Sequence, residues 1–271
     1  DFQLGRDADP ELEKQPERVI PRLRAMLGES TEFTLEWVSV YQFACRRIDQ
    51  FRHGRVIFAG DSAHQVSPFG ARGANTGVQD ADNLIWKLKL VVDGAAPEAL
   101  VDSYADERTF AADDNLLNST RATDFITPKS KGSLLFRNAV LELAQDQPFA
   151  RVLINSGRLS TPTPYLHSPL NTPDEDEFRG AMCPGTPCAD APIGRADGTA
   201  GWFLNLLGDG FVLLCFGELP AGAAIVHGAV CARPISVGDH PGADVGDPEG
   251  LLEQRFDGRR GTLYLIRPDQ H

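Results

Sequence analysis

The chain has 271 residues, of which 42% are apolar and 24% are charged, and its formal net charge is −12. This length allows one large domain or two medium domains with real hydrophobic cores. The acidic balance argues against nucleic acid or an anionic membrane surface as a partner, because both attract basic surfaces. The longest apolar run, residues 211–216, is far too short to span a bilayer, so no membrane association is predicted.

The first ten residues, DFQLGRDADP, are polar and do not begin with methionine, so we expect a fragment or a processed product without a signal peptide. Five scattered cysteines suit a reducing, cytoplasmic compartment. CPGTPC at 183–188 and HGAVC at 227–231 could together supply four zinc ligands. The spacing in the first motif is loose and its prolines already explain a turn, so ordinary thiols and no metal site are favoured.

The first predicted elements are a helix and a strand. Residues 10–30 predict a short helix that ends at Gly28, with acidic residues early and arginines late, as the helix dipole prefers. Residues 33–43, FTLEWVSVYQF, alternate in a way typical of a strand with one aromatic face. We interpret this face as core packing; a pocket wall for a flat ligand is the alternative.

The middle of the chain predicts a strand, a glycine-containing loop and several helices. Residues 55–60, RVIFAG, predict a buried strand of a parallel sheet. From Val78 to Val92 the apolar residues recur at helical spacing with charged residues on the opposite face, and Gly94 suits the helix end. Further helices are predicted from Pro97 onward and over residues 133–145.

Four prolines between residues 161 and 173, followed by DEDE, predict a linker. Beyond it, residues 211–218, 233–238 and 261–268 predict strands, and residues 249–256 predict a short helix. Strands that alternate with short helices indicate a small second α/β domain.

Gly60 and Asp61 stand where the first buried strand ends, which is where open α/β folds place ligands. An ionised Asp61 only accepts hydrogen bonds, so it suits a ligand with hydroxyl groups, such as a sugar or a ribityl chain. A plain strand–loop–helix with turn glycines is the alternative.

The glycines of the following loop also favour a flat ligand. Gly70, Gly73 and Gly77 let the backbone approach a planar molecule without interference from a Cβ atom. Gly73, Ala74 and Asn75 present free N–H groups at a helix N-terminus, which favours negative charge. A reduced flavin develops such charge over its pyrimidine edge.

The stretch GDSAHQVSPFGARGANTGVQDADNLIWKL, residues 60–88, resembles the second flavin motif of the FAD-dependent aromatic hydroxylases, the class A flavoprotein monooxygenases related to p-hydroxybenzoate hydroxylase. FRHGRVIFAGD before it and VDSYADER after it extend the resemblance, which is specific over residues 55–108. In particular it resembles the subgroup that acts on phenol and hydroxyphenylpropionate. That resemblance implies an α/β chain: a partial FAD-binding fold followed by a small thioredoxin-like α/β domain.

The resemblance also implies roles for the cofactor-binding residues. Gly60 and Asp61 would bind the ribityl or pyrophosphate region of FAD. Gly73, Ala74 and Asn75 would meet the pyrimidine edge of the isoalloxazine through backbone groups.

Other loop positions receive roles by the same resemblance. Pro68 and Phe69 would lie on the substrate side of the flavin. His64 is interpreted as a hydrogen-bonding residue that fixes the loop rather than as a base. Arg72 stands where many relatives have glutamine, and it could place a cation near the flavin. No residue of the sequence is singled out as the catalytic base.

Several family features do not occur in the sequence. The G-x-G-x-x-G unit for the ADP moiety and the DG motif shared by FAD and NAD(P)H are absent, and FGELPAG at 216–222 stands where a C-x-x-C would follow the first strand of the last domain. The chain is therefore interpreted as the C-terminal portion of a longer hydroxylase. Its expected parts are the end of a substrate-binding sheet domain (1–50), part of the FAD-binding domain (51–160), a linker (161–178) and a thioredoxin-like domain (179–271).

The function implied for the whole protein is hydroxylation of a small phenolic compound with FAD, NAD(P)H and oxygen. A homodimer is the expected assembly if the protein has a protein partner. An epoxidase or polyketide-type hydroxylase of the same class is one alternative. A non-catalytic flavin-fold module for binding or dimerisation is the other.

Overall fold

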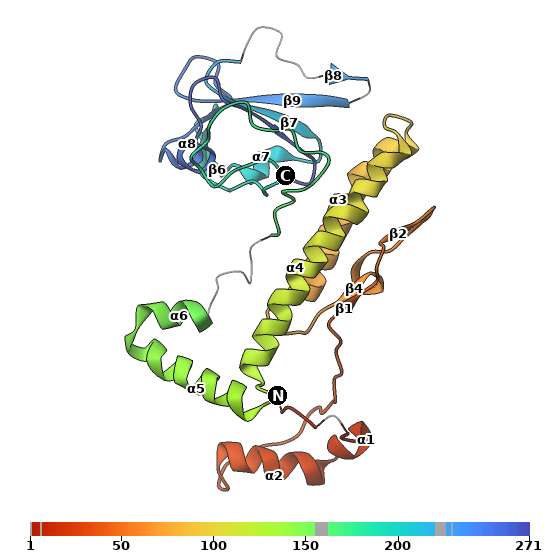
Figure 1. Cartoon of the computed structure of the whole chain (residues 1–271). Coiled ribbons are helices and arrows are strands. Elements are labelled where there is room, and N and C mark those ends of the chain that lie inside the picture. The colour runs from red at the N-terminus through yellow and green to blue at the C-terminus, as the bar shows by residue number, and fades with distance from the viewer. Residues whose placement is uncertain (1, 6, 155–161, 220–225, 229) are drawn as a thin grey trace.

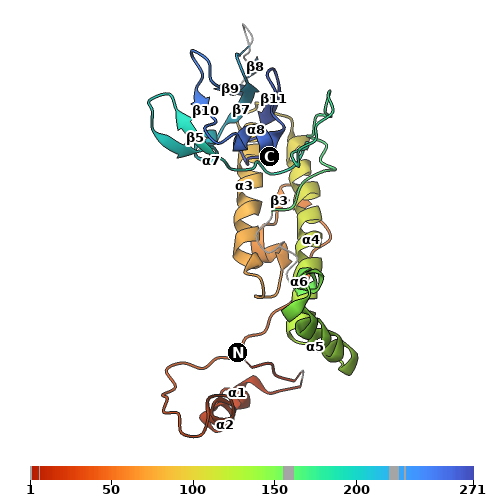
Figure 2. The ribbon, with the colours of Figure 1, turned by 90° about the vertical axis from the view of Figure 1, so that its left-hand side faces the viewer.

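The structure is a computed structural model that describes residues 2–5, 7–154, 162–219, 226–228 and 230–271. Two long helices, α3 (Arg72–Val92) and α4 (Asp102–Ile126), lie side by side and form its spine. A sheet domain sits at one end of this pair and the N-terminal helices lie at the other end (Figures 1 and 2). None of the described helices combines the length and apolar character that a membrane span needs.

The N-terminal segment forms two helices, α1 (Pro10–Glu13) and α2 (Pro16–Leu27). The sequence predicted one helix; the break falls before Pro16, because a proline disfavours helical backbone in the residue that precedes it. The predicted end is confirmed, since Gly28 follows α2 with a φ of 97°.

The strand predicted over residues 33–43 is wrong, because this segment has neither strand nor helix. Its side chains are largely exposed, with Trp37 at 82% and Tyr41 at 71%. Alternation produces a strand only where a second strand completes the hydrogen-bond ladder. The described residues supply no such partner for this segment.

The prediction of a buried parallel strand at residues 55–60 is also wrong. Val56 and Ile57 form strand β3, which pairs antiparallel with β2 (Arg52–His53) in a hairpin that turns at Gly54. Val56 is 57% exposed. A second small ladder joins β1 (Arg46–Arg47) to β4 (His64–Gln65).

Helix α3 forms as predicted, and the face that it buries against α4 is the polar one. The face toward α4 is mostly polar, whereas Val78, Ile85 and Val92 are 64–76% exposed. An amphipathic pattern identifies two faces, but it does not say which face the neighbouring helix will cover. Here α4 brings charged partners for the polar face, so that face is the buried one.

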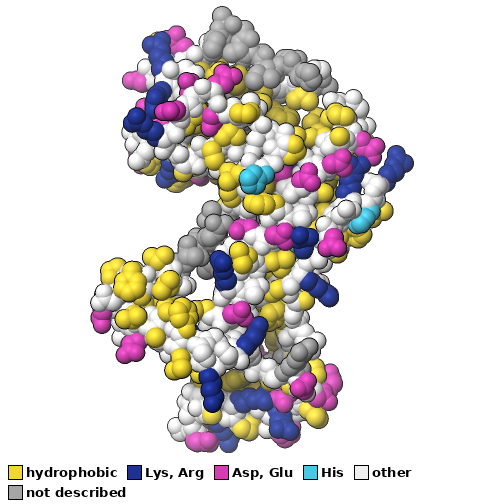
Figure 3. Space-filling model, in the orientation of Figure 1, with side chains coloured by type: hydrophobic (Ala, Val, Ile, Leu, Met, Phe, Trp, Pro, Cys, Tyr) yellow, Lys and Arg dark blue, Asp and Glu magenta, His cyan; other side chains and the backbone are white. Residues whose placement is uncertain are grey.

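Two further helices follow the predictions: η2 (Glu98–Val101) leads into α4, and α5 (Lys131–Asp146) covers residues 133–145. Helix α6 (Pro148–Ile154), which follows α5, was not predicted. The α5–α6 hairpin exposes many apolar side chains, Leu135 and Phe149 among them, which gather on one side of the molecule (Figure 3).

The last part of the chain is a mixed α/β domain, as predicted. Strands β7 (Phe211–Phe216) and β9 (Val230–Val237) pair in parallel at the centre of a sheet with the order β11-β7-β9-β10-β5-β6. Its other elements are β5 (Pro192–Arg195), β6 (Ala200–Trp202), β8 (Val226–His227), β10 (Val245–Gly246), β11 (Leu263–Ile266), α7 (Leu204–Leu207) and α8 (Leu251–Phe256). Residues 162–178 have neither helix nor strand, as their prolines predict; Thr161 and residues 220–222 of FGELPAG lie outside the described residues.

The core of this domain gives a test of its packing. Phe216 is 4% exposed, and a Cβ atom at Gly258 would overlap its ring. We expect Gly258→Ala to lower the free energy of unfolding by about 1–3 kcal/mol through overpacking. Gly210→Ala is the matched control, because a Cβ atom there meets nothing within 4 Å. Chemical unfolding of both variants measures the difference; equal stabilities would contradict the packing described.

Candidate functional site

The turn at Gly60 and Asp61 is held by its backbone. It forms a short 3-10 helix, η1 (Gly60–Ser62), and Gly60 has a φ of 60°, which favours glycine. The Gly60 N–H donates to Asp80 Oδ2 at 2.8 Å, and a Cβ atom at Gly77 would lie 3.5 Å from the Gly60 Cα atom. The turn therefore rests directly on α3, while the side chain of Asp61 is exposed.

The N-terminus of α3 lies next along the chain and has no side-chain cap. Ala71 precedes it in a left-handed conformation, with a φ of 52°, and the first turn contains no acidic residue. Asn75 Nδ2 donates to the Ala71 carbonyl at 2.8 Å and fixes the entry into the helix. Gly73 is half-buried, and Ala74 and Asn75 are exposed. These positions leave the positive end of a 21-residue helix open to an anionic group.

The loop between the turn and α3 is anchored to α4 by hydroxyl groups. Ser67 Oγ lies 2.7 Å from Ser119 Oγ and accepts from Thr123 Oγ1 at 2.8 Å. Pro68 is exposed and Phe69 is half-buried. The anchored loop thus exposes Pro68 to solvent and leaves Phe69 partly exposed.

An aromatic surface continues from this loop into residues 41–43. The Phe69 ring meets the Phe43 ring edge-on, with centroids 6.1 Å apart, and Phe43 stacks with Tyr41 at 6.3 Å. The sequence interpretation of a core face for residues 33–43 is therefore wrong for Tyr41 and Phe43. Their exposure beside Phe69 suits the alternative, a wall for a flat ligand.

Two other residues of the motif point inward. His64 is 2% exposed, its Nε2 lies 2.7 Å from Asp80 Oδ2, and its ring stacks on Phe51, which confirms the loop-fixing interpretation. Arg72 is 6% exposed and donates from Nη1 to Asn115 Oδ1 at 2.6 Å. The guanidinium of Arg72 is thus directed at α4.

The sequence interpretation missed a buried set of charges between α3, α4 and the C-terminal segment. Asp80 accepts from Arg108 Nε at 2.6 Å, and Glu107 accepts from Lys87 Nζ at 2.6 Å. Arg267, close to the C-terminal end, donates from Nη1 to Glu107 Oε1 at 2.7 Å. The spacing of Thr76, Asp80, Asn83 and Lys87 places four polar residues on one face of α3, and this pattern was the available signal.

Burial and pairing act against each other on these groups. Burial alone would raise the pKa of Glu107, but hydrogen bonds from Arg267 and the charges of Arg267 and Lys87 hold it at about 2. Burial lowers the pKa of Lys87 to about 8 against the attraction of Glu107. The pKa of Asp80 also lies below its usual value, because the hydrogen bond from His64 and the charge of Arg108 outweigh burial. At neutral pH the set is therefore ionised.

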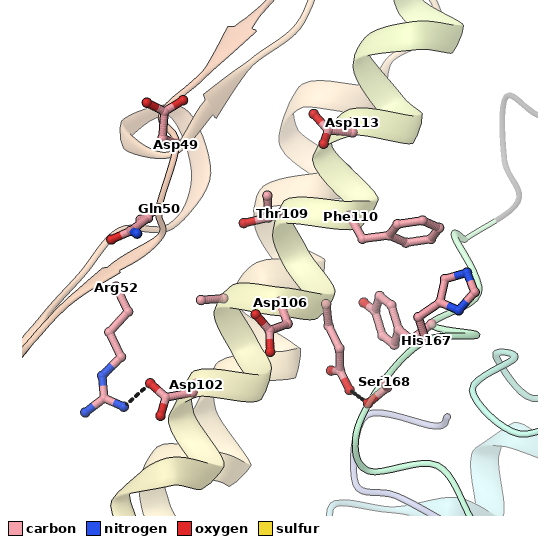
Figure 4. A pocket seen from close by; sticks show the side chains of 13 residues that line it. Asp49, Gln50, Arg52, Asp102, Asp106, Thr109, Phe110, Asp113, His167 and Ser168 are labelled. Atoms are coloured by element: carbon pink, nitrogen blue, oxygen red, sulfur yellow. Dashed lines mark hydrogen bonds and ion pairs between the residues drawn. The ribbon is translucent and has the colours of Figure 1, made fainter. Parts of the chain in front are cut away.

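A cavity of 610 Å³ lies elsewhere, between α4, residues 49–52 and residues 165–168 (Figure 4). Its walls carry several carboxylates; Asp102 pairs with Arg52 at 2.6 Å, and Glu107 accepts from Ser168. None of the predicted cofactor residues lines it. An acidic cavity repels phosphate groups, so it does not suit the pyrophosphate of FAD.

Among the described residues, the His, Cys, Asp and Glu side chains form no group of three or more that could hold a metal ion. The side chain of His227, part of the alternative zinc set, lies outside the described residues.

Known proteins match the chain over these same elements. Residues 2–119 match the family model described as "FAD binding domain", so the chain carries part of a flavin-binding fold. It is 34% identical to 6-methylpretetramide 4-monooxygenase of Streptomyces rimosus over 284 residues, covering 98% of the chain and 49% of that protein. It is 27% identical to 3-(3-hydroxy-phenyl)propionate/3-hydroxycinnamic acid hydroxylase of Mycobacterium sp. (strain JLS), covering 100% of the chain and 50% of that protein.

Solved structures agree with this fold. The flavin-dependent monooxygenase PieE, in complex with FAD and substrate, superposes with a TM-score of 0.75 at 23% identity, covering 99% of the chain and 52% of PieE. Aklavinone-11 hydroxylase, with FAD and aklavinone, gives a TM-score of 0.71 at 26% identity, covering 97% of the chain and 48% of that protein. The chain is therefore similar to flavin-dependent monooxygenases over nearly its whole length, which confirms the resemblance seen in the sequence. It spans about half the length of the curated relatives it matches.

The low pKa of Glu107 predicts acid sensitivity. Its folded value of about 2 lies below the ordinary 4.5, so its contribution is complete above pH 4.5 and is lost as the pH falls toward 2. That contribution is about 3 kcal/mol. We expect Glu107→Gln to lower the free energy of unfolding at pH 7 by about this amount, because the buried cations Lys87 and Arg267 would lose the carboxylate that they share.

Urea unfolding at several pH values between 7 and 3 measures this effect. The wild-type chain should lose stability on acidification more steeply than the Glu107→Gln variant. Glu249→Gln is the control, because Glu249 is exposed. If the free energy of unfolding fell equally with pH in the wild type and in Glu107→Gln, the low pKa assigned to Glu107 would be wrong.

Proposed function

We propose that this chain is the flavin-holding part of an FAD-dependent monooxygenase that hydroxylates a phenolic compound with NAD(P)H and oxygen. The observation that carries the proposal is the open N-terminus of α3 beside the Gly60–Asp61 turn. Both lie inside residues 2–119, the part that matches the FAD binding domain.

The residues present fit the flavin half of FAD. The exposed carboxylate of Asp61 would accept hydrogen bonds from ribityl hydroxyls, and Gly60 keeps the turn free of a side chain. Backbone N–H groups of Gly73, Ala74 and Asn75 would stabilise negative charge on the pyrimidine edge. Bound FAD supplies the redox chemistry and the activation of oxygen, while these residues bind and orient it.

The substrate side of the site would be formed by Pro68 and Phe69 with the aromatic surface of residues 41–43. Phe43 and Tyr41 extend this surface away from the loop. Aromatic walls suit flat phenolic rings, because they bury ring faces and exclude water. The aromatic substrate, oxygen, the nicotinamide donor and the homodimer stay predictions.

The organisation of the whole protein is part of the proposal. We retain residues 1–50 as the end of a substrate domain, 51–160 as part of the FAD-binding domain, 161–178 as a linker and 179–271 as a thioredoxin-like domain. The exposed side of α3 supports a further covering layer, because Val78, Ile85 and Val92 otherwise leave three large apolar side chains in water. The relatives are twice as long and have room for such a layer.

A polyketide-type aromatic is a second candidate substrate. It is favoured by the similarity to 6-methylpretetramide 4-monooxygenase and by that to aklavinone-11 hydroxylase. Turnover assays with single-ring phenols and with fused-ring phenols distinguish the two substrate classes.

The cofactor assignment is tested at Asp61 in the complete protein. Asp61→Ala removes a charged acceptor worth about 1.5–3 kcal/mol, so FAD affinity should fall by about tenfold to a hundredfold. Fluorescence titration of the apoprotein with FAD measures the change. Asp209→Ala is the matched control, because Asp209 is an exposed aspartate of the C-terminal domain. Equal FAD affinities in the wild type and Asp61→Ala would remove Asp61 from the flavin site.

A further inference from the structure

Six charged side chains form one buried cluster that joins the two halves of the chain. Three are cationic and three are anionic, so the cluster is balanced in charge, and none is more than 8% exposed. They come from α3, α4 and the segment after β11: Asp80, Lys87, Glu107, Arg108, Arg267 and Asp269. We call this set the charge cluster.

One end of the charge cluster holds the Gly60 turn. The two oxygens of Asp80 are divided between structural tasks. Oδ2 accepts from the Gly60 N–H at 2.8 Å and lies 2.7 Å from His64 Nε2, whereas Oδ1 accepts from Arg108 Nε at 2.6 Å. Arg108 thus sets the orientation of the carboxylate that fixes the turn.

The other end of the charge cluster holds the C-terminal segment. Arg267 donates from Nη1 and Nη2 to the two oxygens of Glu107, at 2.7 and 3.0 Å, and from Nε and Nη2 to Asp269, at 3.0 and 2.6 Å. Asn83 bridges the two carboxylates, because its Nδ2 donates to Glu107 and to Asp269 at 2.7 and 2.9 Å.

Tyr165 connects the two ends. Its hydroxyl accepts from Arg108 Nη1 at 2.7 Å. Its ring stacks on His271, with centroids 4.2 Å apart, and the Arg267 guanidinium lies 5.8 Å from its centroid. Glu107 and Arg108 are also neighbours on α4, so the contacts of both ends of the charge cluster lie side by side on this helix.

We propose that the segment from Arg267 to His271 is a positioning element for the Gly60–Asp61 turn, acting through Tyr165, Arg108 and Asp80. The importance of this segment for FAD binding rests on the function proposed above. Its link to the Gly60–Asp61 turn rests only on the contacts just described. The C-terminal domain would then fix the site geometry from a distance without contacting the cofactor.

Amide hydrogen exchange of the 271-residue chain tests the link. The reporter is the peptide that spans residues 59–66, which contains the Gly60 amide, and the internal reference is β7. Tyr165→Phe removes only the hydroxyl that accepts from Arg108 and keeps every charge. Arg267→Met removes the guanidinium from Glu107 and Asp269. We expect exchange at the reporter to become at least tenfold faster in both variants, with β7 unchanged.

Two further variants separate positioning from general destabilisation. Arg267→Lys keeps the positive charge but lacks the planar guanidinium that contacts both carboxylates. It should therefore restore part of the exchange protection that Arg267→Met loses at residues 59–66. Arg233→Met is the matched control, because Arg233 belongs to β9 and its Nη2 donates to carbonyls of α7 instead. It should leave the reporter at the wild-type rate.

The outcomes are distinct. If exchange in β7 also becomes faster in Arg267→Met, that variant is destabilised as a whole, and the exchange rate at residues 59–66 in Tyr165→Phe alone tests the proposal. An unchanged reporter in Tyr165→Phe overturns the proposal and leaves the charge cluster as a docking contact between domains. FAD titration of the same variants in the complete protein is read separately: a faster reporter with unchanged FAD affinity supports the link but contradicts the placement of the flavin at this turn.

Discussion

The carboxylate of Asp80 is the interaction on which most of this structure depends. It lies fully buried between α3 and α4, where an isolated negative charge would be costly, so it requires the guanidinium of Arg108. Meeting that requirement places α4 against the polar face of α3. The same carboxylate accepts the Gly60 N–H, so the helix pair and the turn are fixed by one group.

The charge cluster selects an arrangement more than it adds stability. A buried ion pair gains little over an apolar pair of similar volume, but the loss of one partner is costly. The Lys87–Glu107 pair therefore disfavours every packing arrangement in which α3 is rotated about its axis. Such a rotation would expose Lys87 and leave Glu107 buried without this partner. This explains why Val78 and Ile85 are directed away from α4 although they are the more hydrophobic residues.

The sequence predicted local features well and relations between segments less well. The helix over residues 78–92, the proline-rich segment without helix or strand, and strands β7, β9 and β11 follow from short-range patterns, whereas the short strands β5, β6, β8 and β10 were not predicted. The flavin motif was recognisable because its glycines and Asp61 lie close together in the chain. The strand at residues 33–43 failed because pairing needs a second strand, which no pattern within the segment reveals. The charge cluster was missed because its members lie far apart in the chain: Glu107 and Arg267 are 160 positions apart, and Asn83, which bridges the cluster, lies 186 positions from Asp269.

The separation of Asn83 from Asp269 also governs the order in which the molecule is completed during synthesis. Helices α3 and α4 emerge from the ribosome long before residues 267–269, and until then Glu107 has Lys87 but lacks the hydrogen bonds from the Arg267 guanidinium. The helix pair at that stage holds an incomplete set of charges. The contacts around Glu107 are therefore completed only when the C-terminal segment has been synthesised.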